Sequence, residues 1–233
     1  MDMKKYASMP VSDIESYQYA ASYELAGKEF TFKMDDGSSA TMAFAAFPCK
    51  EVCVNGAASG VNYDCVKISD HVVYFTYRLP EAFVAYVLDM EKGRITRAVT
   101  GTGSKTVINF GVAGNSNDLQ TFTDDLSGNK VRWTLGKLET STFLAAYGAD
   151  GLSLTRPYAA DAPAITASDF RAVKITDSVY LQTAVIQTAG ETVSVNMVSN
   201  FWNITCVGSI YGVSATKGVR CKLFAGYGRF MNE

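Results

Sequence analysis

Short stretches of alternating hydrophobic and polar residues run through almost the whole chain, and turn-forming Gly, Asn and Asp residues separate them. Because successive side chains of a strand point to opposite faces, a period of two predicts β-strands. Helical spacing is confined to Ser12 to Tyr23, where Ser12 or Asp13 is suited to cap a short helix. The pattern therefore predicts an all-β protein with one short N-terminal helix.

The alternating stretches fall into two sets of eight predicted strands. The first set lies near Glu29–Met34, Ser39–Ala46, Glu51–Asn55, Asn62–Ile68, Val72–Leu79, Phe83–Met90, Arg94–Thr102 and Thr106–Ala113. The second lies near Lys130–Leu135, Thr140–Tyr147, Leu152–Arg156, Phe170–Thr176, Val179–Gln187, Thr192–Ser199, Ile204–Tyr211 and Val219–Phe230. Most of these strands are only a few residues apart, which favours antiparallel hairpins, and eight antiparallel strands are enough to close a barrel.

The two sets share colinear segments, which indicates an internal duplication. Leu25–Lys28 aligns with Leu126–Asn129, and Tyr63–Asp70 aligns with Phe170–Asp177. Arg94-Ile95-Thr96 is matched with Asn203-Ile204-Thr205. We therefore expect an N-terminal extension (1–24), a first barrel (25–114), a linker (115–125) and a second barrel (126–233).

Composition narrows the range of functions. The chain has 233 residues, of which 48% are hydrophobic, and its formal net charge is −2. Without a basic surface it is not expected to bind nucleic acid, and without a long apolar run it is not expected to enter a membrane. No secretory signal is visible, so the expected location is the cytoplasm.

The cysteines and the histidine give little support for a metal site. Five cysteines, an odd number, are scattered along the chain, which contains a single histidine. This pattern is typical of reduced thiols rather than a disulfide framework, and it lacks the ligand set of a zinc site. We expect no metal and no other cofactor.

Several motifs resemble the bacterial MoaF-like family, whose halves are related to lipocalin-like (calycin) barrels. They are Leu25–Phe30 with Asp36-Gly37, Tyr63-Asp64 with Val73–Phe75, Val87–Asp89 with Lys92–Arg94, Thr123–Gly128, Ile210–Gly212 and Gly226–Phe230. The chain is also distantly similar to phenolic acid decarboxylases, which are single barrels of the same superfamily. The resemblance implies tandem calycin barrels and a cofactor-independent lyase or isomerase acting on an aromatic or polyketide-like acid.

Candidate catalytic residues come from the first set of strands. In Val72–Leu79, alternation places Tyr74 and Arg78 on one face. If that face points inward, Arg78 would hold a carboxylate while Tyr74 donates a proton, and Glu51 would act as a buried acid. The alternative is that Arg78 and Glu51 face solvent, as charged residues usually do.

Large aromatic residues are the candidate ligand contacts. They are Tyr77, Tyr86, Trp133, Tyr147, Tyr180 and Trp202. Their alternative role is core filling. The expected partner is a small hydrophobic or aromatic ligand, and homodimer formation stays open. If the chain is not an enzyme, the alternative function is a carrier or sensor of such a ligand.

Overall fold

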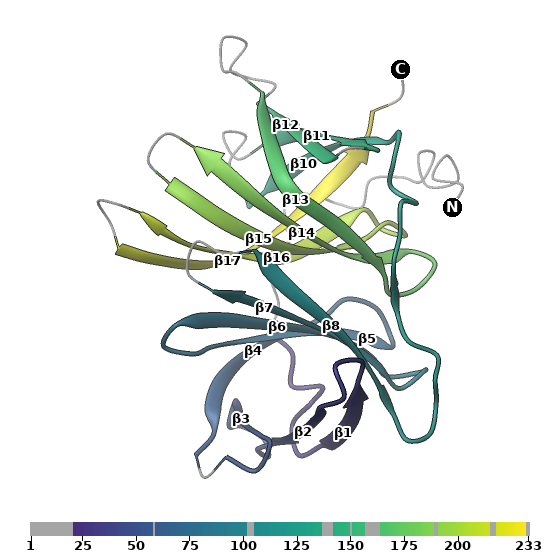
Figure 1. Ribbon diagram of the computed structural model, residues 1–233, viewed down its shortest axis with the longest axis vertical. Coiled ribbons are helices and arrows are strands. Elements are labelled where there is room, and N and C mark those ends of the chain that lie inside the picture. The colour runs from purple at the N-terminus through teal and green to yellow at the C-terminus, as the bar shows by residue number, and fades with distance from the viewer. Residues whose placement is uncertain are drawn as a thin grey trace. The chain divides into compact units, whose positions relative to one another are not determined.

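The computed structural model describes residues 21–57, 59–101, 105–136, 142–149, 151–156, 164–188, 191–214 and 218–231. Within these ranges the regular structure is entirely β, as the alternation predicts, and the chain forms two compact units. The expected helix at Ser12 to Tyr23 lies mostly outside the described residues, and residues 21–23 are not helical. Each unit contains a closed antiparallel barrel (Figure 1).

The first barrel is a meander in which every strand pairs with the next. Its strands are β1 (Glu29–Met34), β2 (Ser39–Phe44), β3 (Glu51–Val54), β4 (Val61–Lys67), β5 (Val72–Arg78), β6 (Ala82–Asp89), β7 (Arg94–Gly101) and β8 (Thr106–Ala113). Pairing of β1 with β8, in which Phe32 lies opposite Ala113, closes the barrel. Closure leaves no free sheet edge.

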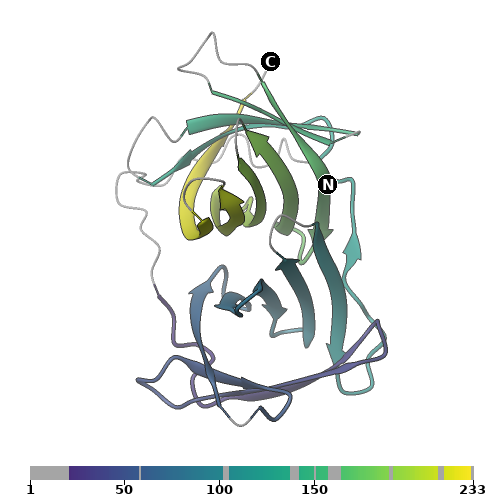
Figure 2. The same cartoon turned by 60° about the vertical axis from the view of Figure 1, so that its left-hand side comes forward.

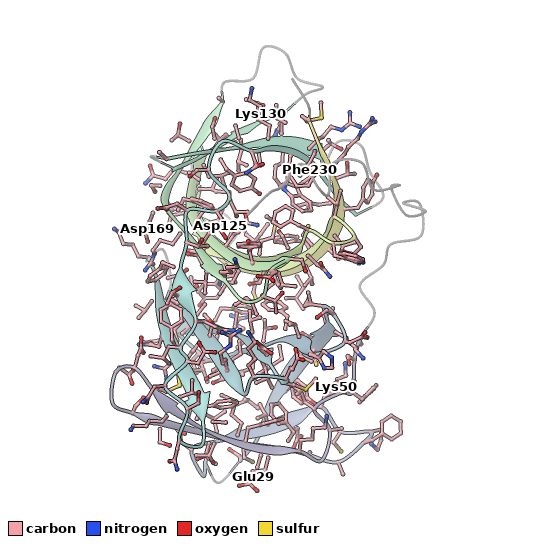
Figure 3. The ribbon with its side chains drawn as sticks, turned by 90° about the vertical axis from the view of Figure 1, so that its right-hand side faces the viewer. Glu29, Lys50, Asp125, Lys130, Asp169 and Phe230 are labelled. Carbon is pink, nitrogen blue, oxygen red and sulfur yellow. The ribbon has the colours of Figure 1, made fainter. Side chains whose placement is uncertain are left out.

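The second barrel has the same construction with one added strand. Its strands are β9 (Thr121–Phe122), β10 (Lys130–Leu135), β11 (Thr142–Gly148), β12 (Gly151–Thr155), β13 (Ile165–Lys174), β14 (Val179–Thr188), β15 (Glu191–Asn200), β16 (Thr205–Ser214) and β17 (Gly218–Phe230). Strand β10 pairs with both β11 and β17, and β12 pairs with β13 to close the wall, while the short β9 adds to β13. Figures 2 and 3 show β10 to β17 curving into a ring.

Matching turns support the duplication. In the first barrel the backbone N–H of Ile68 donates to the carbonyl of Val72 over 2.8 Å, and in the second Ile175 donates to Val179 over 2.9 Å. The turns before β1 and β10 contain Gly27 and Gly128, with φ of +71° and +82°. Glycine adopts this left-handed conformation without the steric cost that a Cβ would bring.

The strand register corrects part of the sequence alignment. Asp89 pairs with Arg94 across one hairpin, and Asn200 pairs with Thr205 across the corresponding hairpin. Arg94 is therefore the counterpart of Thr205, and the predicted match of Arg94 with Asn203 is wrong by two residues. The match failed because the Ile-Thr pair lies at different places in the two hairpins: Ile95 and Thr96 are within β7, whereas Ile204 is in the turn before β16.

Hydrophobic side chains line the interior of each barrel. In the first, the cluster includes Phe44, Tyr63, Phe75, Tyr77 and Tyr86. Their rings form a continuous aromatic group, in which Phe75 and Tyr86 stack with centroids 4.8 Å apart. Such ring pairs add to the stability gained from burying apolar area.

Candidate functional site

The predicted catalytic residues do not gather inside the first barrel. On β5 the interior positions are Val73, Phe75 and Tyr77, so the alternating residues Tyr74 and Arg78 belong to the outer face. Tyr74 is buried there, with 1% of its surface exposed, whereas Arg78 is exposed at the strand end. Glu51 is also exposed, on the face opposite buried Val52. The strand face that carries Tyr74 and Arg78 therefore points away from the barrel interior, although the predicted site requires it to point inward. A catalytic role for these residues stays a prediction.

The predicted ligand contacts of the first barrel, Tyr77 and Tyr86, are part of its core. Both side chains are buried, and their hydroxyl oxygens lie 3.3 Å apart in a hydrogen bond. Burial raises the pKa of both hydroxyls above the usual value of 10.0. Tyr86 stacks on Phe75 and contacts Tyr77, so both tyrosine rings occupy the core, and ligand contact by them stays a prediction.

The four candidates in the second barrel have different surroundings. Trp133, Tyr147 and Tyr180 are buried, but Trp202 is 57% exposed in the turn after β15. The indole N–H of Trp133 donates to the Tyr147 hydroxyl over 3.2 Å. Tyr180 packs edge-on against the Phe201 ring and donates to Asp125 over 3.1 Å.

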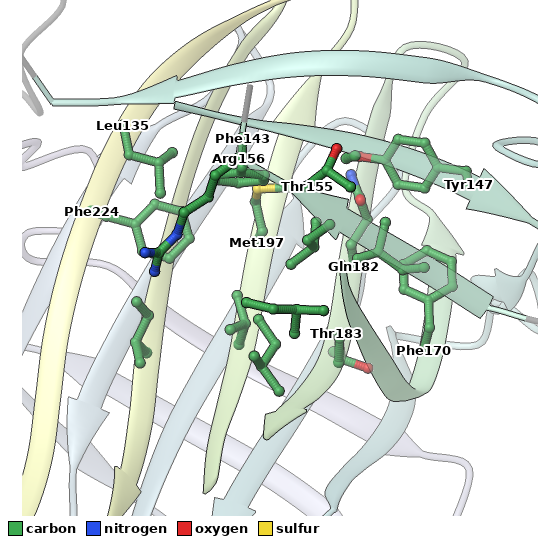
Figure 4. A pocket seen from close by; sticks show the side chains of 18 residues that line it. Leu135, Phe143, Tyr147, Thr155, Arg156, Phe170, Gln182, Thr183, Met197 and Phe224 are labelled. Atoms are coloured by element: carbon green, nitrogen blue, oxygen red, sulfur yellow. The ribbon is translucent and has the colours of Figure 1, made fainter. Parts of the chain in front are cut away.

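A cavity of about 250 Å³ lies in the second barrel (Figure 4). Among the predicted residues, only Tyr147 lines it. The other lining residues are mostly apolar: Leu135, Phe143, Ala145, Leu152, Leu154, Thr155, Arg156, Ile165, Phe170, Gln182, Thr183, Ala184, Ile186, Val195, Met197, Ile210 and Phe224.

Three changes between the barrels account for this space. The shared turns and register make Gln182 the counterpart of Phe75, Ala184 that of Tyr77, and Met197 that of Tyr86. Gln182 lies opposite Met197 on β14 and β15, as Phe75 lies opposite Tyr86 on β5 and β6. The second barrel therefore has smaller or unbranched side chains where the first has stacked rings.

Two polar side chains lie together on one wall of the cavity. Figure 4 shows the Tyr147 hydroxyl near the Gln182 amide. Burial raises the pKa of Tyr147 above its usual value, although hydrogen bonding from Trp133 and Gln182 opposes the shift. Tyr147 is therefore a neutral hydroxyl at physiological pH. It can donate a hydrogen bond to a ligand, but it is poorly suited to give up its proton.

Among the described residues that line the cavity, Arg156 is the only one with a charged side chain. Its side chain is exposed, and its guanidinium extends in Figure 4 toward Phe224 on β17. No ion pair holds this guanidinium among the described residues. An exposed guanidinium at the margin of an apolar cavity can bind an anionic group outside the hydrophobic part.

Sequence reasoning missed Arg156, Gln182, Ala184 and Met197. The signal was present in the divergence of the two copies, because an aromatic residue in one barrel aligns with a smaller or flexible one in the other. In this way Tyr77 aligns with Ala184, and Tyr86 aligns with Met197.

Other features restrict the chemistry of the described residues. In those ranges there is no helix with the length and apolar character needed to cross a membrane. Nor do three or more His, Cys, Asp or Glu side chains gather there in a cluster suited to a metal ion. The cysteines are free thiols.

Fold and cavity together define an all-β protein of two antiparallel barrels, the second of which holds a small-molecule-sized cavity. A comparison of the sequence with protein-family models gives no match, and a comparison with curated proteins gives none either.

Proposed function

We propose that the second barrel binds a small, mostly hydrophobic molecule and that the protein is a carrier or sensor of that molecule. The observation that carries this proposal is the apolar cavity of about 250 Å³ among β10 to β17. Small-molecule sites are typically concave and apolar, with a few polar groups that orient the ligand. Because a cavity of about 150 Å³ holds benzene, this one accommodates roughly ten non-hydrogen ligand atoms.

Arg156 extends the ligand class toward acids. If the hydrophobic part of an acid lies inside the cavity, its carboxylate lies at the margin, where the Arg156 guanidinium can bind it. The exposed position limits the gain to about three- to ten-fold in affinity, because water screens the charges. Hydrophobic burial therefore supplies most of the affinity, and Arg156 adds a preference for anions.

A lyase or isomerase is the function that the family resemblance implies, and its acid/base chemistry needs a proton donor or acceptor near the ligand. The cavity offers Tyr147, whose pKa is raised by burial, and Arg156, but the described residues that line it include no carboxylate and no histidine. These residues support binding and orientation of a ligand better than proton transfer.

The test uses 2-naphthoate, whose ring system has the size that the cavity accommodates. Calorimetric titration is expected to show one binding site per chain, and native mass spectrometry after long incubation should recover the compound unaltered. Ala184→Phe places a ring where the first barrel has Tyr77, and it is expected to weaken binding at least about ten-fold. The matched control, Gln187→Ala, changes an exposed residue of the same strand and should bind normally.

Three outcomes would contradict the proposal. If 2-naphthoate does not bind, the cavity is not a site for this class of molecule. If Ala184→Phe binds as well as the unmodified chain, the site lies elsewhere. Conversion of the compound during incubation would show an enzyme in place of a carrier. Arg156→Met removes the charge and keeps the unbranched apolar stem, so it should weaken the binding of 2-naphthoate but leave the binding of uncharged naphthalene unchanged.

A further inference from the structure

The Gln182 side chain carries a buried hydrogen-bond acceptor without a partner. Only 3% of the residue is exposed, and its Nε2 donates to the Ser199 hydroxyl over 2.8 Å. Its Oε1 has no hydrogen-bond partner among the described residues. Because an unpaired polar atom in an apolar interior is costly, buried acceptors in native proteins nearly always have a donor.

The position of this side chain suggests where the missing donor belongs. Gln182 occupies the interior position that Phe75 has in the first barrel, and it lines the cavity. Phenylalanine at this position places no polar atom in the interior, so the fold itself does not require an amide here. A hydrogen bond to a ligand would explain why the second barrel has the polar Gln182 where the first barrel has the ring of Phe75.

Tyr147 provides the complementary group beside it. Its oxygen accepts the indole hydrogen of Trp133 over 3.2 Å and a further hydrogen bond from the Gln182 side chain, which together use both of its acceptor lone pairs. The hydroxyl therefore has a hydrogen to donate, and the neighbouring Oε1 of Gln182 needs one. A ligand atom that contacts both the Tyr147 hydroxyl and this Oε1 must accept one hydrogen bond and donate another.

We propose that the ligand of the second barrel carries a neutral hydroxyl group at its buried end, which accepts from Tyr147 and donates to Gln182. This inference rests on the proposed function of the cavity. A hydroxyl is the smallest group with both a donor and acceptor lone pairs, whereas a carboxylate or an ether only accepts. The apolar wall around these two residues, including Phe170 and Met197, would contact the hydrocarbon part.

Three uncharged compounds of nearly equal size test the proposal, namely 2-naphthol, 2-methoxynaphthalene and naphthalene. The unmodified chain is expected to bind 2-naphthol at least about ten-fold more tightly than the other two in calorimetric titrations. Gln182→Leu removes the acceptor while keeping a similar volume, so it should remove this preference and retain binding of naphthalene. The control Gln187→Leu, on the exposed part of the same strand, should preserve the preference.

A second variant keeps the test decisive if Gln182→Leu fails to fold. Tyr147→Phe removes only the hydroxyl and should reduce the advantage of 2-naphthol over naphthalene at least about three-fold. Equal binding of all three compounds by the unmodified chain would overturn this inference but leave the proposed function standing, because a water molecule could then satisfy Gln182. If none of the three binds, the proposed function fails as well.

Discussion

The walls of the two barrels have the same construction, but the side chains inside them differ. Each has eight strands in its closed ring, and the turn at Ile68 recurs at Ile175 with nearly the same hydrogen-bond length. Inside, however, the stacked pair Phe75 and Tyr86 corresponds to Gln182 and Met197. The comparison teaches that turns and register maintain the fold, whereas a few interior side chains decide whether a barrel is filled or hollow.

Buried polar groups differ between the barrels in the same way. In the first, Arg94 forms a 2.7 Å ion pair with buried Asp89. Their counterparts in the second barrel are the uncharged Thr205 and Asn200. Conversely, Tyr180 and Lys174 both contact Asp125 in the second barrel. The first barrel has the apolar Val73 at the position of Tyr180, so it lacks the tyrosine contact. Each barrel is therefore stabilised by its own polar contacts, and exchanging the residues tests the comparison.

The largest effect is expected from emptying the first barrel. Tyr77→Ala introduces the small residue that Ala184 provides in the second barrel. It should lower the free energy of unfolding by about 3–5 kcal/mol, because a buried ring is lost and a cavity remains. Urea denaturation measures the loss. A loss below about 1 kcal/mol would show that Tyr77 does not fill the core as described.

A similarly large effect is expected at the buried ion pair. Asp89→Ala leaves Arg94 without its buried partner, although Asp118 remains 3.4 Å away. We expect a loss of about 3 kcal/mol in urea denaturation. The double variant Asp89→Asn with Arg94→Thr reproduces the uncharged pair of the second barrel, and it should lose less than the single variant. An equal or larger loss would contradict the idea that the pair is interchangeable.

A smaller effect is expected at Gly228 on β17, which lies against the Trp133 ring. A Cβ at this position would lie 2.7 Å from a ring carbon of Trp133. Gly228→Ala should therefore lower the free energy of unfolding by about 1–3 kcal/mol and shift the fluorescence of the buried tryptophan. The exposed neighbour Arg229 is the control, and Arg229→Ala should change neither quantity.

The smallest effect is a pH dependence specific to the second barrel. Burial raises the pKa of Asp125, but hydrogen bonds from Lys174 and Tyr180 outweigh it and hold the pKa below the usual 3.8. Since the folded-state pKa is depressed, this contact stabilises the protein above about pH 4 and is lost as the pH falls through the folded-state pKa.

The measurement for this contact is the urea midpoint from pH 7 down to pH 3. Asp125→Asn should lower stability by about 0.5–1 kcal/mol at pH 7, a difference that shrinks toward pH 3. A constant difference across that range would show that the charge of Asp125 is not what stabilises the fold.

The strand pattern could be predicted because alternation and turn residues are local properties. All sixteen strands of the two closed barrels are found near their predicted places, with shifts of at most three residues at the ends except in β13, which begins at Ile165 and not at Phe170. In β1, β8 and β10 the predicted and observed limits agree. Period-two patterning and turn glycines are legible without knowledge of the remainder of the fold.

The interior could not be predicted in the same way, because alternation defines two faces without saying which points inward. In β5 both faces are buried up to Tyr77, so hydrophobicity does not distinguish the interior residue Phe75 from the outer residue Tyr74. The cavity depends on which residues meet across β14 and β15, and that requires the register. Residue type alone does not predict burial either, since Trp202 is a large aromatic residue but lies in an exposed turn.

The second barrel is hollow where the first is filled, and the binding of xenon in crystals of the protein is the measurement that examines this difference without a specific ligand. Xenon enters apolar cavities without needing a specific ligand. We expect xenon in the second barrel beside Ala184 and Met197, and none at the corresponding level of the first barrel, where Phe75 and Tyr86 stack. Xenon between those aromatic side chains, or none beside Ala184, would contradict it.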